Sequence, residues 1–354
     1  MKNLILFAAM AAIAVSCAKT GEINPVSEQA IGFDTWKNNL TKSEHSVFTS
    51  GAKFDVYGYK HKNDGNVNTT VFDGDDVVLD NNGSWNYSGI RFWDRTTDSY
   101  TFFAISPAGI TSTAPAQTGL FVTNDITFDG KTSGDVLVAR KKTVEKDKYG
   151  LEVQLEFVPQ AALFDLKVKK AKNLKEAKLT INSVSIKNIE SAGHLSVTNY
   201  DGTTKPVATW TLADPSVKDD FDNTDGIYSV SPLPSINAGV EHGIENSQFL
   251  INNLIVMPQT LITGGQQLEI EYTINFSGET ITHSRTIDLN RFDDTDVDQD
   301  AGRTEAAQNA GEFINAWERG KHYTYYLTIN ADLIVFTATI SDWTDADAFH
   351  YIIN

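Results

Sequence analysis

The stretch Leu268-Glu269-Ile270-Glu271-Tyr272-Thr273-Ile274-Asn275-Phe276 decides the fold class. Apolar and polar side chains alternate in it, and this period of two places every second side chain on the same face of a β-strand. One face of such a strand lies in a core and the other faces water, as is typical of antiparallel sheets. The pattern predicts a half-buried strand at this place.

The same alternation recurs elsewhere in the chain. It is present in residues 151–157, 164–169 and 334–340, and clusters of Gly, Asn, Asp and Pro separate such segments. Short alternating strands between turn signals are typical of β-sandwiches. The best candidate for a helix is 305–319, where apolar residues have roughly helical spacing. We therefore expect an all-β fold of two tandem β-sandwich domains with few short helices.

Composition sets limits on size and partners. The chain has 354 residues, 41% of them hydrophobic, and a net charge of -17 from 29 basic and 46 acidic residues. This is long enough for two domains with real cores. The negative charge argues against nucleic acid and anionic lipid headgroups as partners, because both would be repelled. The simpler role of the acidity is to keep an exposed protein soluble.

The first residues indicate export. A short positive start is followed by the apolar run 4–15, which is shorter than the roughly 20 residues of a membrane-spanning helix and typical of a secretory signal. Ala14-Val15-Ser16-Cys17 then resembles a bacterial lipobox, and Cys17 is the only cysteine of the chain. The alternative is a chance cysteine beside an ordinary cleavage site. We expect Cys17 to be acylated and to anchor the protein in the outer membrane. A single acyl chain binds a membrane only weakly, whereas the multiple acyl chains of a bacterial lipoprotein hold it firmly.

These signals divide the chain into four parts. Residues 1–17 are the expected lipoprotein signal peptide and 18–30 a polar tether. The charged, strand-poor stretch 141–150 indicates the junction between the domains. We therefore place the N-terminal β-sandwich at 31–146 and the C-terminal one at 147–354.

Three further stretches carry a family resemblance. They are Leu254-Ile255-Val256-Met257-Pro258-Gln259 with Gly264-Gly265 after it, then Trp317-Glu318-Arg319-Gly320-Lys321-His322-Tyr323, and finally 334–340 closing on Ser341-Asp342-Trp343. In this order, behind a lipobox, they resemble the fimbrillin (Mfa-like) family of Bacteroidetes surface pilins and anchors. The residues also have ordinary structural roles, since Pro258 suits a strand end, the glycine pair a turn, Trp317 and Trp343 a core, and Gly320 a helix cap.

The resemblance implies transthyretin-like sandwich domains and a structural role in a pilus that serves adhesion. In that family a subunit loses its first strand to a protease, and a strand of a neighbouring subunit fills the groove. Ile31 and Phe33 lie in the expected first strand, so they are candidates for exchange. The oral members are cut after arginine, whereas the first arginine here is Arg91. Either another protease cuts, for example after Lys42, or the strand stays and the protein is an anchor or accessory subunit.

The C-terminal segment is the second exchange candidate. Phe349, Tyr351 and Ile353 would line one face of a short strand. A loose apolar tail is uncommon, so this segment is expected to dock, either in its own domain or in a neighbouring subunit.

No pattern indicates an enzyme, a cofactor or a metal. The chain has no GxSxG, HExxH, GxGxxG or phosphate-binding lysine motif, and its histidines are scattered. The acidic stretch 293–300 has carboxylates that could converge on Ca²⁺, but it fails the EF-hand pattern, and a solvated loop is the simpler interpretation. The expected partners are other pilus subunits and the outer membrane.

A second hypothesis is a surface lipoprotein that binds a host or glycan ligand as a tip adhesin. Trp85-Asn86-Tyr87 and Arg91-Phe92-Trp93 could stack on sugar rings if they are exposed. The alternative is that these aromatic residues belong to the core or to strand pairing.

Overall fold

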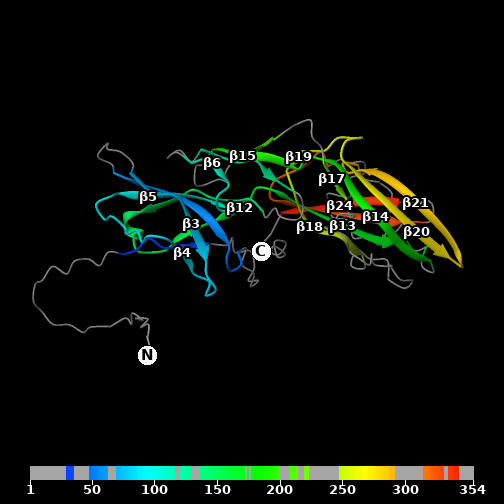
Figure 1. Cartoon of the computed structure of the whole chain (residues 1–354), viewed down its shortest axis with the longest axis horizontal. Coiled ribbons are helices and arrows are strands. Elements are labelled where there is room, and N and C mark those ends of the chain that lie inside the picture. Colours follow the sequence, from blue (N-terminus) through cyan, green and yellow to red (C-terminus); the bar gives the residue numbers. More distant parts are fainter. Residues whose placement is uncertain are drawn as a thin grey trace, which may run out of the picture.

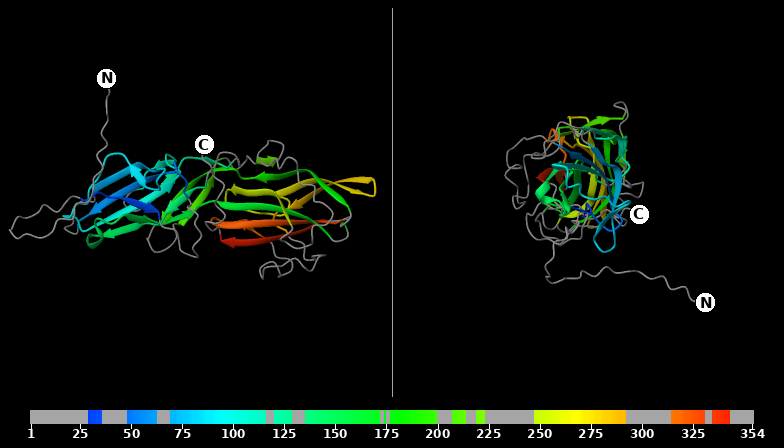
Figure 2. Two further views of the ribbon diagram at one scale, coloured as in Figure 1. Left: turned by 90° about the horizontal axis from the view of Figure 1, so that it is seen from below. Right: turned by 90° about the vertical axis from the view of Figure 1, so that its left-hand side faces the viewer.

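The computed structural model describes residues 29–35, 48–62, 69–115, 120–128, 135–171, 174, 177–199, 207–213, 219–222, 247–291, 314–330 and 334–342. They form an elongated molecule with two β-rich lobes, one built mainly from the first half of the chain and the other from the second (Figure 1; Figure 2). The fold class predicted from the alternating segments, an all-β sandwich fold, is confirmed. No helix among these residues is long and apolar enough to cross a membrane.

The first lobe is organised by one large sheet. Its strand order is β12-β9-β5-β2-β3-β4, with β10 also paired to β5. The strands are β2 (Lys53–His61), β3 (Thr69–Leu79), β4 (Trp85–Tyr87), β5 (Ser99–Ser106), β9 (Leu137–Ala139), β10 (Lys142–Glu145) and β12 (Phe157–Pro159). Because both faces of its central strands are buried, this sheet needs a cover on each side.

A second sheet covers one of these faces. Its order is β16-β15-β7-β6, with β8 also paired to β15. The strands are β6 (Thr111–Thr113), β7 (Phe121–Thr123), β8 (Ile126–Thr127), β15 (Ala192–Asn199) and β16 (Val207–Leu212). Strands from both halves of the chain meet in it, and Tyr57, Phe103, Leu195 and Met257 share its buried cluster. This core therefore joins the two lobes.

The other face of the large sheet is covered by two short strands. They are β1 (Phe33–Thr35) and β11 (Val153–Leu155), which pair in parallel with Phe33 opposite Val153. The core beneath them is rich in aromatic rings, among them Phe54, Phe72 and Phe102.

The second lobe is a sandwich of two four-stranded sheets, with orders β18-β13-β23-β24 and β17-β14-β20-β21. The strands are β13 (Ala162–Lys170), β14 (Lys178–Ile189), β17 (Asp219–Asp222), β18 (Gln248–Val256), β20 (Gln267–Phe276), β21 (Glu279–Asp288), β23 (Lys321–Ile329) and β24 (Ile334–Asp342). Its core is mainly aliphatic and includes Leu166, Ile181, Leu268 and Leu327.

Several predictions about strands are confirmed and some are not. Leu268, Ile270, Tyr272 and Ile274 are buried as the alternation predicts, although Phe276 at the end of β20 is 54% exposed. In β13 the expected water-facing side is wrong, because Asp165 and Lys169 are also buried. Residues 151–157 do not form the single alternating strand that was expected. Leu151 is 63% exposed, and Val153–Leu155 form β11 whereas Phe157 begins β12, which belongs to a different sheet.

The expected helix 305–319 is wrong over its described end. Residues 305–313 lie outside the described part, but Ala316–Trp317 form strand β22, which pairs with β19 (Gln259–Thr260). Trp317 is buried, and its Nε1 donates a hydrogen bond to the Tyr325 hydroxyl at 2.9 Å. The tryptophan is thus anchored in the core by strand geometry. The described residues include the short 3-10 helix η1 (Lys146–Lys148).

The expected domain junction at 146/147 falls within η1. Strands beyond it still pair with the first lobe, since β11 pairs with β1 and β12 with β9. The chain enters the second lobe with β13, whose first residue is Ala162. We propose that the boundary is better placed near Gln160.

Candidate strand-exchange groove

Three backbone segments form a roof over the aromatic face of the large sheet. The middle segment, 29–35, lies between 91–93 on one side and β11 on the other. The amide of Ile31 donates to the carbonyl of Arg91 at 2.8 Å, and the amide of Trp93 donates to the carbonyl of Gln29 at 3.0 Å. On the other side, the amide of Val153 donates to the carbonyl of Gly32 at 2.8 Å. The middle segment is therefore held by backbone bonds from both neighbours.

Two side chains of this middle segment enter the core. Ile31 and Phe33 are 1% and 3% exposed. Both were predicted from the sequence as strand-exchange candidates, and the structure places both on the inner face of the roof. Burying a side chain of this kind stabilises the folded state by about 1.5–3 kcal/mol relative to leaving it in water.

A tyrosine hydroxyl also holds the middle segment. The Tyr87 hydroxyl donates to the carbonyl of Ile31 at 2.7 Å, and the amide of Arg91 donates to the same hydroxyl at 3.3 Å. Burial raises the pKa of Tyr87, so the hydroxyl keeps its proton and remains a donor. Tyr87 thereby links the middle segment to the loop that carries Arg91.

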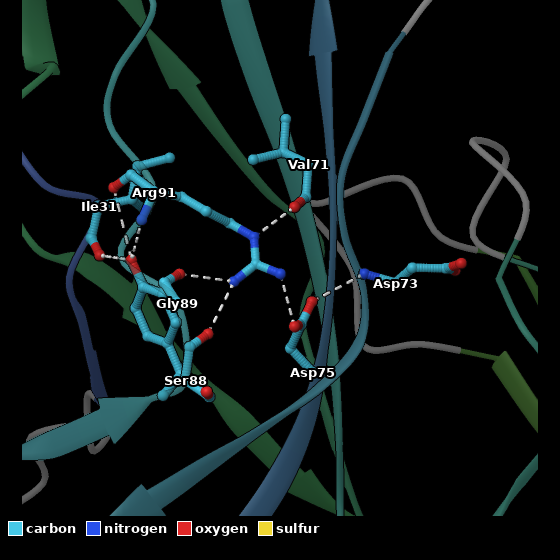
Figure 3. Close-up of polar contacts among 8 residues, drawn as sticks. Ile31, Val71, Asp73, Asp75, Ser88, Gly89 and Arg91 are labelled. Carbon is cyan, nitrogen blue, oxygen red and sulfur yellow. Dashed lines mark hydrogen bonds and ion pairs between the residues drawn. The ribbon is translucent and has the colours of Figure 1, made fainter.

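Arg91 fixes the shape of this loop (Figure 3). Its Nε donates to the carbonyl of Val71 at 2.7 Å, and its Nη1 donates to the carbonyls of Ser88 and Gly89 at 3.1 and 3.0 Å. Its Nη2 pairs with Asp75 Oδ1 at 2.6 Å. The planar guanidinium thus donates hydrogen bonds to four oxygens of β3 and the loop. None of these four oxygens belongs to the middle segment, so the guanidinium contacts themselves do not involve that segment.

Asp94 stabilises the turn that follows Trp93. Its carboxylate accepts hydrogen bonds from the amide and hydroxyl of Thr96 and pairs with Lys60 at 3.0 Å. Hydrogen bonds from Thr96, and then from Lys60, hold the pKa of the Asp94 carboxyl well below its usual range. The charged carboxylate therefore helps to fix the turn after Trp93.

The other predicted site residues lie outside the described residues. These are Cys17, Lys42, Phe349, Tyr351 and Ile353, as well as the acidic stretch 293–300. Among the described residues, no group of His, Cys, Asp and Glu side chains could hold a metal ion. The buried pair of His322 Nε2 and Asp165 Oδ2, 2.9 Å apart, joins neighbouring strands of the second lobe.

The aromatic residues proposed for stacking on sugars are mostly part of the core. Trp93 is 5% exposed and stacks on Tyr149 with ring centroids 4.8 Å apart. Trp85 is half-buried against Phe48 and Phe54. Of these residues only Phe92, at 44% exposure, presents much surface. The hypothesis of a sugar-stacking face is therefore wrong at Trp93, whose ring is buried in the core of the first lobe, whereas Trp85 is packed against that core and only half-buried.

Sequence reasoning missed the residues that hold the groove. Tyr87 was considered either as a sugar-stacking surface residue or as a core or strand-pairing residue, and no structural role was predicted for Arg91. The pairing partner of the alternating stretch 151–157 was not identified. No pattern of side chains identifies these residues, because three of the four acceptors of the Arg91 guanidinium are backbone carbonyls.

The comparisons with known proteins decide the family. The sequence matches the family described as fimbrillin-like over residues 41–343. The chain belongs to the fimbrillin-like family. None of the curated proteins matches it. This fimbrillin-like chain is similar to the crystal structure of a fimbrial protein from Bacteroides vulgatus, with 17% identity, a TM-score of 0.57, and coverage of 89% of this chain and 100% of that one.

A second solved structure has a similar extent. It is described as a cell adhesion protein from Bacteroides uniformis, and it is 16% identical, with a TM-score of 0.49 and coverage of 91% of this chain and 100% of that one. At such identities the likeness to solved structures shows the fold alone. The family membership supports a pilus or adhesion role at the cell surface.

Proposed function

We propose that this fimbrillin-like protein is a structural subunit of a cell-surface pilus, and that its subunits join by β-strand exchange. The observation that carries the proposal is the middle segment of the roof. Its strand β1 has 3 residues, yet the segment closes the core between two other backbone segments. No reacting group takes part in this scheme, so the proposed function requires no catalytic activity.

Removal of residues 29–35 would leave a slot with a strong tendency to bind another strand. The amides of Trp93 and Val153 and the carbonyl of Arg91 would lose their partners. The aromatic core beneath Phe33 would also meet water. An added strand satisfies the backbone groups and covers the apolar surface at the same time. The same forces that hold β1 would therefore bind a strand of another subunit.

The sequence order links release from the membrane to opening of the slot. Cys17, the proposed lipid attachment site, and β1 both precede Lys42. A cut after Lys42 would therefore separate the anchor and the resident strand from the remaining chain in one step. The C-terminal segment with Phe349, Tyr351 and Ile353 is the proposed donor. A subunit that is not cut would remain in the outer membrane as an anchor.

Limited proteolysis followed by size-exclusion chromatography tests this proposal. After a cut at Lys42, we expect the monomer to convert to polymers as the fragment 18–42 is released. The matched control combines Lys37→Gln and Lys42→Gln, which removes both lysines between β1 and β2, and it should remain monomeric under the same treatment. A cut chain that releases the fragment but stays monomeric would contradict a role as a polymerising subunit.

Mass spectrometry of the mature N-terminus tests the anchoring part. We expect an acylated Cys17 on chains retained in the membrane and a new terminus beyond Trp36 on chains in filaments. Cys17→Ser should abolish membrane retention. An unmodified Cys17 on membrane-bound chains would contradict the lipid anchor without affecting strand exchange.

A further inference from the structure

The side chain of Phe33 occupies a box of aromatic rings. Its ring centroid lies 6.3 Å from that of Phe54, 5.2 Å from Phe72, 5.8 Å from Tyr87 and 5.7 Å from Phe102. All four neighbours are oriented edge to face with it. Such pairs are worth about 0.5–1.5 kcal/mol beyond the burial of area. The box therefore favours an aromatic side chain over an aliphatic one of similar size.

The box is narrow because a glycine lies at its base. A Cβ on Gly58 would be 2.9 Å from Phe72, closer than real Cβ contacts, and 3.1 Å from Phe102, which is tighter than most of them. Glycine at this position of β2 lets the two rings lie against the strand backbone. On the outer side, the guanidinium of Arg91 lies 4.5 Å from the centroid of Phe72. Two walls of the box are thus set by residues outside segment 29–35.

The backbone bonds of the groove do not select a sequence. They join amides and carbonyls of Gln29, Ile31 and Gly32 to the two flanking segments, and any extended strand offers the same groups. A slip of one residue would turn the ring of Phe33 out of the box and bring Gly32 or Asp34 in, because side chains of a strand alternate between faces. The aromatic side chain is therefore the feature that can fix the register.

We infer that the Phe33 box is the register-setting pocket of the groove, and that in an assembled subunit it takes Tyr351 of a second copy of this chain. This inference rests on the proposed strand exchange. With Tyr351 in the box, Phe349 and Ile353 lie two positions away on either side, whichever direction the strand runs. The resident strand has Ile31 and the half-buried Thr35 at these positions. The incoming segment thus replaces a threonine with an apolar residue, which favours the exchange.

Peptide exchange into the cut protein tests the inference. The full chain carries a site-specific protease sequence after Lys42, and it is cut and mixed with a labelled peptide of residues 345–354, whose binding is followed by fluorescence anisotropy. We expect Tyr351→Ala in the peptide to weaken binding at least about a hundredfold, the effect of truncating a buried aromatic side chain. Phe349→Ala and Ile353→Ala should each weaken binding about tenfold. Tyr351→Phe should bind about as well as the original peptide.

The outcomes distinguish the register-setting pocket from strand exchange itself. Equal losses for the three alanine peptides would overturn the register-setting pocket and leave strand exchange intact. A failure of both this peptide and a peptide of residues 29–36 to bind would overturn strand exchange and the pocket together. Binding of the 29–36 peptide alone would overturn Tyr351 as the occupant.

A change in the pocket complements the peptide series. Gly58→Ala should reduce the preference for Tyr351 over alanine at least about tenfold, because the added methyl group displaces Phe72 or Phe102. Near-UV circular dichroism checks that this variant is folded. If it is not, the peptide variants decide the matter, because they leave the protein unchanged. An unaltered preference in a folded Gly58→Ala protein would overturn the role of the box.

Discussion

The roof of the first lobe and the sandwich of the second lobe bury apolar side chains in different ways. The second lobe uses long strands, such as β14 with 12 residues and β20 with 10, and each contributes several buried side chains to one mainly aliphatic core. The roof uses β1, with 3 residues, and two buried side chains of its segment, Ile31 and Phe33, above an aromatic core. A strand can be exchanged only where its loss leaves the rest of the fold standing. We propose that the roof meets this condition and that the sandwich does not.

The largest expected effect is at the centre of the second lobe. Phe164 is fully buried, and its ring centroid lies 5.0 Å from Tyr325 and 5.5 Å from Trp317. Phe164→Ala should reduce the free energy of unfolding by about 3–5 kcal/mol. Urea unfolding followed by tryptophan fluorescence measures the loss. A change under about 1 kcal/mol would show that the sandwich tolerates loss of a core ring, and the contrast with the roof would fail.

The same truncation at Phe33 should have a local effect. We expect Phe33→Ala to weaken docking of segment 29–35 by about 2–3 kcal/mol, so that the Val153 amide exchanges its hydrogen roughly 30 to 150 times faster. Exchange of the β14 and β20 amides should not change. Phe276→Ala, at an exposed site of the second lobe, is the control and should alter neither region. Equal acceleration in both lobes would mean that β1 is part of the global fold.

The sequence predicts the sandwich better than the roof, for a physical reason. A strand such as β20 is buried on one face along its length, so its alternation is sufficient to place Leu268, Ile270 and Tyr272 inward. In the roof, the decisive contacts join the Tyr87 hydroxyl and the Arg91 guanidinium to backbone oxygens far away in sequence. Backbone oxygens are present at every residue, so no pattern of side chains can point to them.

The exchange candidates were only partly accessible to sequence reasoning. Ile31 and Phe33 stand out because they alternate with Gly32 and Asp34. Their partner Val153 belongs to a stretch whose alternation was recognised, but its pairing in parallel with β1 depends on the tertiary fold. The helix expected at 305–319 failed at Trp317 for the same reason, since pairing with Gln259 outweighs helical spacing.

A smaller effect is expected from one hydroxyl group. Tyr87→Phe removes the hydrogen bond to the carbonyl of Ile31 but keeps the ring in the box. The cost should be about 1 kcal/mol, seen as roughly fivefold faster release of a cut 18–42 fragment. The matched control is Tyr323→Phe, since that hydroxyl accepts the amide of Glu318 in the second lobe. If both variants release the fragment at the rate of the unchanged protein, the hydroxyl of Tyr87 does not hold the strand.

The smallest effect concerns acid. Hydrogen bonds from Thr96 and Lys60 hold the pKa of Asp94 in the folded protein well below its usual range, so folding favours the ionised form. A depressed pKa contributes stability that is present above the unfolded-state value and is lost as the pH falls through the folded-state value. We expect retention of the cut fragment to weaken as the pH falls below about 4.

Asp94→Asn, which has no titrating carboxyl there, should hold the fragment less well at pH 7, and its difference from the unchanged protein should shrink in acid. Asp94 and its partners Thr96 and Lys60 all lie beside the roof. The substitution should therefore leave the stability of the second lobe unchanged. A difference between the two proteins that stays constant from neutral pH to acid would show that the charge of Asp94 does not support the groove.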